Sequence, residues 1–183
     1  MASAEKHHTP ELPAFDKPVK LLIVVSPCNK DIADNLVSGA KQAIGNAGGR
    51  YDLVEMPRVL EIPSAVAIAE RISNFDGYVA LGCVMDDPVV YGEVMRALGQ
   101  LGLAGICVGN GILTGEVMAE VMAENLNEPS QCGLNKGADA AIAALHLVAL
   151  SRKWGRETKG IGFKPASGEF LMADNPNNGP KIA

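Results

Sequence analysis

Ionisable side chains directly follow the most apolar run of this sequence. The run is GYVALGCVM at residues 77–85, and Asp86, Asp87 and Tyr91 come soon after it. Its length and Val content are typical of a strand buried on both faces in the middle of a parallel sheet. Ligands of open parallel sheets bind just beyond the carboxyl ends of such strands. We therefore expect the chemistry of this protein between Val84 and Tyr91.

Residue types alone identify no catalytic group in this segment. Asp86 and Asp87 could bind a divalent cation, since such ions prefer carboxylate oxygens. Two adjacent carboxylates without further placed ligands are usually part of a solvated loop, so we predict no metal site here. Tyr91 is a poor base, because the pKa of a tyrosine in water is about 10.

Apolar runs and helical periodicities alternate along the chain and predict the elements that position this segment. We expect strands at residues 20–26, 51–56, 77–85 and 105–110. We expect helices at residues 31–47, 63–72, 88–101, 115–125 and 136–154. This order predicts an α/β fold with right-handed crossovers, in which helices cover both faces of a four-stranded parallel sheet in a three-layer α/β/α sandwich.

Composition divides the chain into three parts. Residues 1–18 are polar and are expected to form an N-terminal arm, and residues 19–154 hold the aliphatic runs of one domain. Residues 155–183 are rich in Gly, Pro, Asn and Lys, which predicts a flexible C-terminal tail without a core of its own.

Charge and hydropathy exclude several classes of partner. The net charge is −5 and no basic cluster occurs, which argues against nucleic acid. No apolar run reaches the roughly 18 residues of a membrane span, and the polar N-terminus lacks the apolar core of a signal peptide. The four cysteines form no CxxC pair, which favours reduced thiols. We therefore expect a cytoplasmic protein that binds neither nucleic acid nor membrane.

Five segments, in order, resemble motifs of the lumazine synthase family. They are VVSPCN (24–29), MPRVLEIP (56–63), ALGCVM (80–85), GNGILT (109–114) and NKGADAA (135–141). Their order and spacing over about residues 18–154 identify the chain as a member of the family. The resemblance implies a flavodoxin-like topology and a homopentamer with sites shared between adjacent subunits. It also implies that no cofactor or metal is used.

The resemblance implies roles for individual residues. Glu61 matches a glutamate that binds ribityl hydroxyls, a role that suits a carboxylate because it accepts several hydroxyl donors. Lys136 matches a lysine near the phosphate of the second substrate. The ring pocket would be lined by Cys28, Val59, Leu60, Val84, Met85, Asn110 and Ile112, the last two from the adjacent subunit. The alternatives are a solvated acid for Glu61, a solvated helix-start residue for Lys136, and ordinary core for the apolar residues.

Three positions depart from the family pattern. Cys28 stands in place of an aromatic residue that stacks on the heterocycle. The segment Asp86–Tyr91 stands in place of R-G-x-T-x-H, so the phosphate-binding Gly-x-Thr and the catalytic His are not found. The family His position lies near Tyr91 or is deleted. Glu124 stands about where the family has an arginine near the phosphate.

The resemblance implies a transferase of riboflavin biosynthesis. It would condense 5-amino-6-(ribitylamino)uracil with 3,4-dihydroxy-2-butanone 4-phosphate to give 6,7-dimethyl-8-ribityllumazine. Because of the departures, we expect this activity to be impaired. The alternative is a non-catalytic relative that serves as a pentameric scaffold or binds a flavin or pterin. The loop at residues 124–135 is longer than in shell-forming members, so we expect assembly to stop at five subunits.

Overall fold

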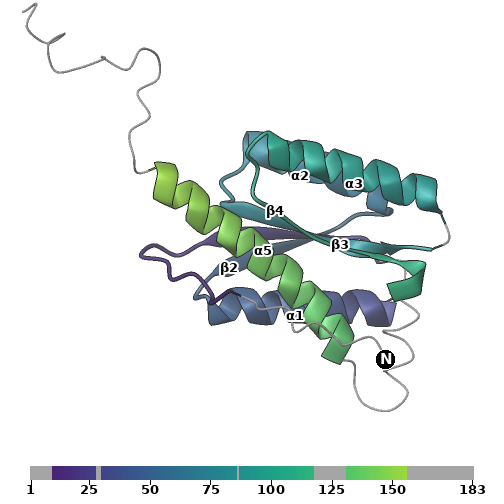
Figure 1. The fold of residues 1–183 in the computed structure, drawn as a ribbon, viewed down its shortest axis with the longest axis horizontal. Helices are drawn as coiled ribbons and strands as arrows, with labels where there is room; N and C mark the ends of the chain where they lie inside the picture. The colour runs from purple at the N-terminus through teal and green to yellow at the C-terminus, as the bar shows by residue number, and fades with distance from the viewer. Residues whose placement is uncertain (1–9, 28–29, 86, 118–130, 156–183) are drawn as a thin grey trace, which may run out of the picture.

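Four parallel strands form one sheet at the centre of the molecule (Figure 1). The computed structural model describes residues 10–27, 30–85, 87–117 and 131–155. The strands are β1 (Lys20–Val25), β2 (Arg50–Glu55), β3 (Gly77–Val84) and β4 (Val108–Thr114). Their order in the sheet is β2-β1-β3-β4, with every neighbouring pair parallel. This is the flavodoxin-like order, in which the chain changes direction of travel between β1 and β3.

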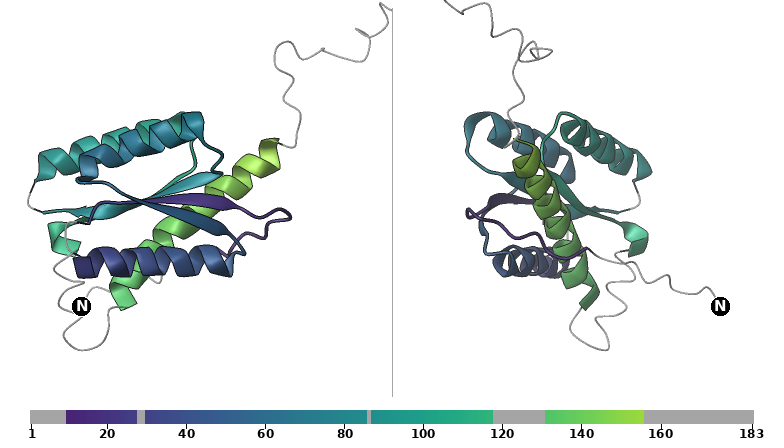
Figure 2. Two further views of the ribbon diagram at one scale, coloured as in Figure 1. Left: turned by 180° about the vertical axis from the view of Figure 1, so that it is seen from behind. Right: turned by 60° about the vertical axis from the view of Figure 1, so that its left-hand side comes forward.

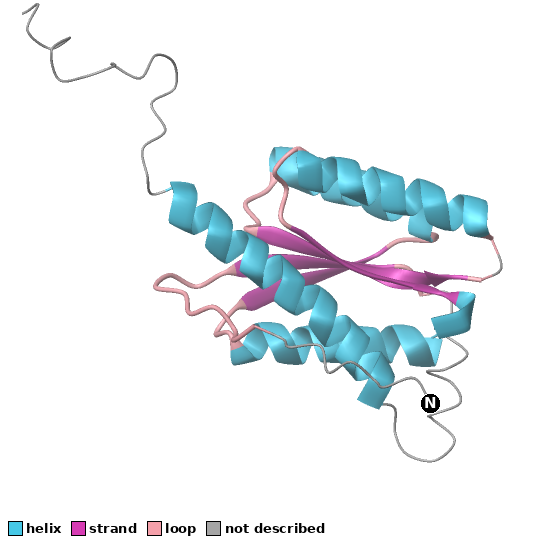
Figure 3. Ribbon diagram, viewed as in Figure 1, coloured by secondary structure: helices cyan, strands magenta, loops and turns pink. Residues whose placement is uncertain are grey.

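Helices cover both faces of the sheet, so the predicted three-layer sandwich is confirmed (Figures 1 and 3). The helices are α1 (Lys30–Asn46), the 3₁₀ turn η1 (Val59–Glu61), α2 (Ile62–Ile72), α3 (Pro88–Leu103) and α5 (Gln131–Gly155). The two further views show α1 and α5 together on one face and α2 and α3 on the other (Figure 2).

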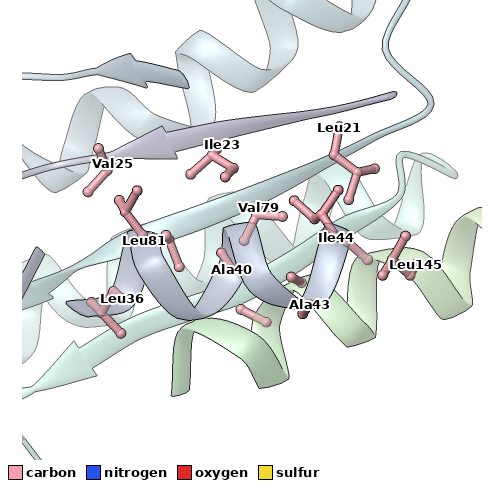
Figure 4. Close-up of a cluster of buried hydrophobic side chains, with 14 of the residues drawn as sticks. Leu21, Ile23, Val25, Leu36, Ala40, Ala43, Ile44, Val79, Leu81 and Leu145 are labelled. Carbon is pink, nitrogen blue, oxygen red and sulfur yellow. The ribbon is translucent and has the colours of Figure 1, made fainter. Parts of the chain in front are cut away.

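Strand β3 lies at the centre of both hydrophobic layers. All eight of its residues are buried. Val79, Leu81 and Cys83 face α1 and α5, in the core that Figure 4 shows. Tyr78 and Ala80 face α2 and α3. Because side chains alternate between the faces of a strand, a continuous apolar run is what a strand covered on both faces requires.

The expected position of the fourth strand was wrong. We expected residues 105–110, but β4 runs from Val108 to Thr114 and pairs in register with β3, from Tyr78 opposite Val108 to Val84 opposite Thr114. Its glycines suggest a turn, yet they serve close packing. A Cβ at Gly109 would lie 1.8 Å from the backbone oxygen of Ala140 in α5. Only a residue without a side chain lets the helix approach this closely.

Helix α5 begins five residues earlier than the expected residue 136. Its first half crosses α1 at close range, since a Cβ at Gly137 would lie 1.9 Å from the backbone oxygen of Leu36. Of the helix expected at residues 115–125, residues 115–117 are helical and the rest lies outside the described residues. The expected long loop at 124–135 also lies mostly outside them.

Arg152 attaches the chain before β1 to the domain. Its guanidinium donates to the carbonyl oxygens of Lys17 (2.7 Å) and Pro18 (3.2 Å) and to the carboxylate of Asp76 (2.8 Å). It also lies 5.4 Å from the ring centroid of Phe15. The planar guanidinium has enough donors to hold all three partners at once. The last residues of the expected arm are therefore tied to α5 and to the start of β3.

We expect Arg152→Ala to lower the free energy of unfolding by about 2 kcal/mol, because charged hydrogen bonds contribute about 1.5–3 kcal/mol and the pair is partly open to solvent. The free energy of unfolding of Arg152→Lys should lie between those of the parent protein and Arg152→Ala, since an ammonium group lacks the planar fork that spans the three partners. Urea unfolding at one fixed protein concentration measures both. Lys153→Ala, at the exposed neighbouring position, is the control and should change stability little. Equal stability of all four proteins would contradict this role.

Candidate functional site

The candidate residues meet at the carboxyl edge of the sheet. Turn η1 follows β2, Met85 follows β3, and β4 ends at Thr114 at the same edge. In a flavodoxin-like sheet this edge is where ligands bind, beside the change of direction between β1 and β3. The structure therefore brings together most of the residues that the sequence suggested. Cys28, Asp86 and Glu124 lie outside the described residues.

Turn η1 carries three of the predicted residues in three different environments. Val59 is buried in the core between the sheet and helices α2 and α3. Leu60 is exposed. Glu61 is half-buried and is the residue from which α2 begins. Pro63 stands at the first turn of α2, where its missing N–H costs no hydrogen bond. The turn thus offers one apolar anchor and one carboxylate to the edge of the sheet.

Glu61 has a carboxylate oxygen that is ready for a ligand. Its Oε2 is buried and accepts no hydrogen bond in the described part of the chain. Its Oε1 lies 3.9 Å from Nε of the exposed Arg58, which is a long and solvent-open pairing. A buried acceptor without a donor costs free energy, so such groups are rare in folded proteins. A hydroxyl of a ligand would satisfy this oxygen.

A cavity of about 300 Å³ lies where β3 and β4 end. Its lining consists of Val84, Asp87, Pro88, Tyr91, Thr114, Gly115 and Glu116. Val84 and Tyr91 were predicted to lie here. Thr114 and Glu116 were missed, because the fourth strand was expected to end at Asn110. The position of TGE directly after an apolar GIL run was the available signal.

Asp87 has a structural role that the sequence did not suggest. Its side chain accepts a 3.0 Å hydrogen bond from the backbone N–H of Val90 and caps α3, with Pro88 in the first turn. An N-terminal cap of this kind satisfies one of the free N–H groups of a helix. The cavity nevertheless has two acidic side chains, Asp87 and Glu116, and no Lys or Arg among the lining residues described.

The remaining predicted residues occupy different positions. Met85 is exposed beside this cavity, whereas Ile112 is buried in the core of its own subunit. The amide of Asn110 donates to Sδ of Met95 (3.2 Å) and accepts from the N–H of Ile112 (3.1 Å). Lys136 is exposed on α5 and lies inside the helix instead of at its start. The structure therefore leaves Lys136 on the helical layer opposite η1.

The cysteines differ from the expectation of four reduced thiols. Cys83, at the end of β3, is disulfide-bonded, and its partner is not among the side chains that the structure describes. Cys107 is free, and burial raises the pKa of its thiol. In the described part of the chain, no group of three or more His, Cys, Asp or Glu side chains is arranged to hold a metal ion. None of the helices described is long and apolar enough to cross a bilayer.

The family model of 6,7-dimethyl-8-ribityllumazine synthase matches residues 18–152. The chain belongs to this family. A 6,7-dimethyl-8-ribityllumazine synthase of Jannaschia sp. (strain CCS1) is 45% identical, with 89% of this chain and 92% of that protein aligned. One from Novosphingobium aromaticivorans is 39% identical over 74% of this chain and 98% of its own. A 6,7-dimethyl-8-ribityllumazine synthase 1 of Rhizobium meliloti is 38% identical over 77% of this chain and 97% of its own length.

The residues that the family model matches include Glu61 and the turn that carries it. The segment that resembles the family, residues 56–63, is the one that forms η1 and the start of α2. The match to the Jannaschia protein covers 89% of this chain, whereas residues 18–152 of the family model are about 74% of it, so that match extends beyond the family model. The relationship therefore covers the whole sheet and both helical layers.

We expect two substitutions at Asp87 to separate its two effects. Asp87→Ala removes the cap and should lower the free energy of unfolding by about 1 kcal/mol. Asp87→Ser keeps a capping oxygen but removes the charge, so it should retain stability and bind inorganic phosphate more tightly than the parent protein. Urea unfolding and calorimetric titration with phosphate measure the two effects. Weaker phosphate binding by Asp87→Ser would show that the carboxylate does not oppose the anion.

Proposed function

We propose that this protein is a 6,7-dimethyl-8-ribityllumazine synthase. It condenses 5-amino-6-(ribitylamino)uracil with 3,4-dihydroxy-2-butanone 4-phosphate, a step of riboflavin biosynthesis. The observation that carries the proposal is the buried, unpartnered Oε2 of Glu61 at the carboxyl edge of the sheet. Its place in a chain of this family supports a ribityl hydroxyl as the missing donor. The relatives' names support neither the expected impairment nor the non-catalytic alternative.

In this proposal each site residue contributes binding and orientation. Glu61 holds the ribityl hydroxyls, and the segments at Val59–Leu60 and Val84–Met85 line the ring pocket together with Cys28. Asn110 approaches the ring from the adjacent subunit, and Lys136 attracts the phosphate. Ile112 is buried in the core of its own subunit, so its side chain does not reach the ring. Holding two reactants in the right geometry can contribute about 7–11 kcal/mol to catalysis, so a site without a histidine base can still condense them.

We also propose a homopentamer whose sites are completed by the adjacent subunit. An apolar groove of about 650 Å³ supports this, because it is open in the single chain and reaches Glu61. It is lined by residues of β1, β2, η1 and α2, among them Leu22, Val54, Met56 and Ile68. Tyr51, Leu53 and Val54 of the edge strand β2 are exposed. Large apolar surfaces of this kind are typical of protein contacts.

The location and the chain ends complete the proposal. We place the protein in the cytoplasm, with residues 19–154 as the catalytic domain, 1–18 as an arm and 155–183 as a flexible tail. Limited proteolysis tests the division: cuts should fall before residue 19 and after residue 154, while the domain persists. Early cuts within residues 19–154 would contradict it. Cell fractionation tests the location, and recovery of the protein with membranes would contradict it.

We expect purified protein to form lumazine from its two substrates and Glu61→Ala to bind riboflavin about 10–100-fold more weakly. The weakening follows because a charged hydrogen bond contributes about 1.5–3 kcal/mol. An absorbance assay follows the product, and calorimetry follows riboflavin. Glu93→Gln, an exposed acid of α3 paired with Arg96, is the control and should change neither. Binding of riboflavin without any product would favour the non-catalytic alternative.

Sedimentation velocity should show a single species with the mass of five chains, and electron micrographs should show no hollow shells. A neighbouring chain must cover the apolar surface of the groove beside η1. Shells are not expected, because the longer loop at residues 124–135 would disturb packing between pentamers. A monomer at micromolar concentration would contradict the shared site. Spherical particles would contradict the limit of five subunits.

A further inference from the structure

Three segments of the fold, one of which carries Glu61, meet at Gly82 of β3. A Cβ at Gly82 would lie 2.9 Å from Cγ1 of Val59, 3.5 Å from Cβ of Ser26 and 3.6 Å from Cδ1 of Ile112. These neighbours belong to η1, to the end of β1 and to β4. We propose that Gly82 is a positioning residue: its missing side chain sets how closely η1, and with it the Glu61 carboxylate, lies on the sheet. The effect on substrate rests on the proposed function.

Only one of the three contacts is too short for a side chain at position 82. Distances of 3.5 and 3.6 Å are ordinary van der Waals contacts, whereas real Cβ atoms essentially never come as close as 2.9 Å. Val59 cannot easily turn away, because it is buried and its branched Cβ restricts the rotamer. A methyl group on residue 82 therefore has to push η1 away from the sheet.

A shift of Val59 is carried to Glu61 through the backbone of the turn. The N–H of Ile62 donates to the carbonyl oxygen of Val59, and the N–H of Glu61 donates to that of Arg58 at 3.2 Å. These two bonds close the short turn that contains both Val59 and Glu61, so the backbone passes a shift of one residue to the other. Ile62, which follows, is fully buried and limits the movement to a tilt of the turn. Such a tilt changes the direction of the Glu61 carboxylate, whose Oε2 is the proposed acceptor.

The displacement should affect the ribityl-bearing substrate more than the ketose phosphate. Gly82 lies in the face of β3 that carries Tyr78, Ala80 and Val84 toward α2 and α3. Lys136 lies on α5, which covers the opposite face. The ribityl-binding carboxylate thus moves with η1, while the proposed phosphate-binding lysine stays in place. This predicts a difference between the two Michaelis constants.

The test compares Gly82→Ala with a compensated double variant. In Gly82→Ala we expect KM for the ribitylaminouracil to rise about tenfold, since a misdirected carboxylate loses part of its charged hydrogen bond to the substrate. KM for the ketose phosphate should change less than about twofold. Val59→Ala removes Cγ1, so the double variant Gly82→Ala/Val59→Ala should return KM for the ribitylaminouracil to that of Val59→Ala alone.

Gly77→Ala is a matched control at the other end of the same strand. A Cβ at Gly77 would lie 2.8 Å from Cγ2 of Val148 and 3.0 Å from the carbonyl oxygen of Cys107, remote from η1. It should lower the melting temperature at least as much as Gly82→Ala does, yet leave KM for both substrates unchanged. If Gly82→Ala does not fold, KM for the ribitylaminouracil is compared between the double variant and Val59→Ala, because the double variant has room for the new methyl group.

Three results would overturn the proposal. The first is a Gly77→Ala variant that raises KM for the ribitylaminouracil as much as Gly82→Ala does, and the second is a double variant that shows no recovery. The third is a crystal structure of Gly82→Ala in which η1 has not moved, a readout that does not depend on activity. A displaced η1 with unchanged ribityl binding would count against the role of Glu61, and would leave the effect of Gly82 on η1 supported.

Discussion

The burial of β3 on both faces is the constraint on which the rest of the structure depends. Because both faces are covered, every residue of the strand has to match a helical layer, and small residues decide how near each layer lies. Gly109 of the neighbouring strand and Gly137 of α5 let backbones approach where a single methyl group would collide. This packing explains why an aliphatic chain with few aromatic residues can form a continuous core.

The same packing positions the site. Helices α2 and α3 lie over one face, and Val59 of the short turn η1 packs against β3 where Gly82 has no side chain. Glu61 is thereby held at the carboxyl edge with one oxygen buried and no donor in the described part of the chain. Burial of this oxygen without a donor is unfavourable in the free protein, and the proposed ligand hydroxyl would supply the missing hydrogen bond.

Charge is distributed unevenly around the edge. The cavity where β3 and β4 end has Asp87 and Glu116 in its described lining, and Lys136 lies on the far helical layer. A phosphate in this cavity therefore needs positive charge from outside its described lining. The capping of α3 by Asp87 shows why the acid is present: the bond to the Val90 N–H helps to begin the helix that follows the strand. Local helix formation and anion binding impose opposite demands on this position.

The sequence by itself determined the fold class, three of the four strands, the resemblance to the family and the placement of Glu61 in a turn before a helix. These features depend on local periodicity, on capping residues and on motif order, all of which are present in a single chain. It misplaced β4, because glycines that permit close packing look like turn residues when the approaching backbone is unknown, and it put the start of α5 five residues too late. Only the tertiary structure showed that Gly82 meets three segments of the fold, that Asp87 caps α3 and that Thr114 and Glu116 line the cavity. Each of these depends on distances between segments far apart in the chain, which hydrophobic pattern alone does not specify.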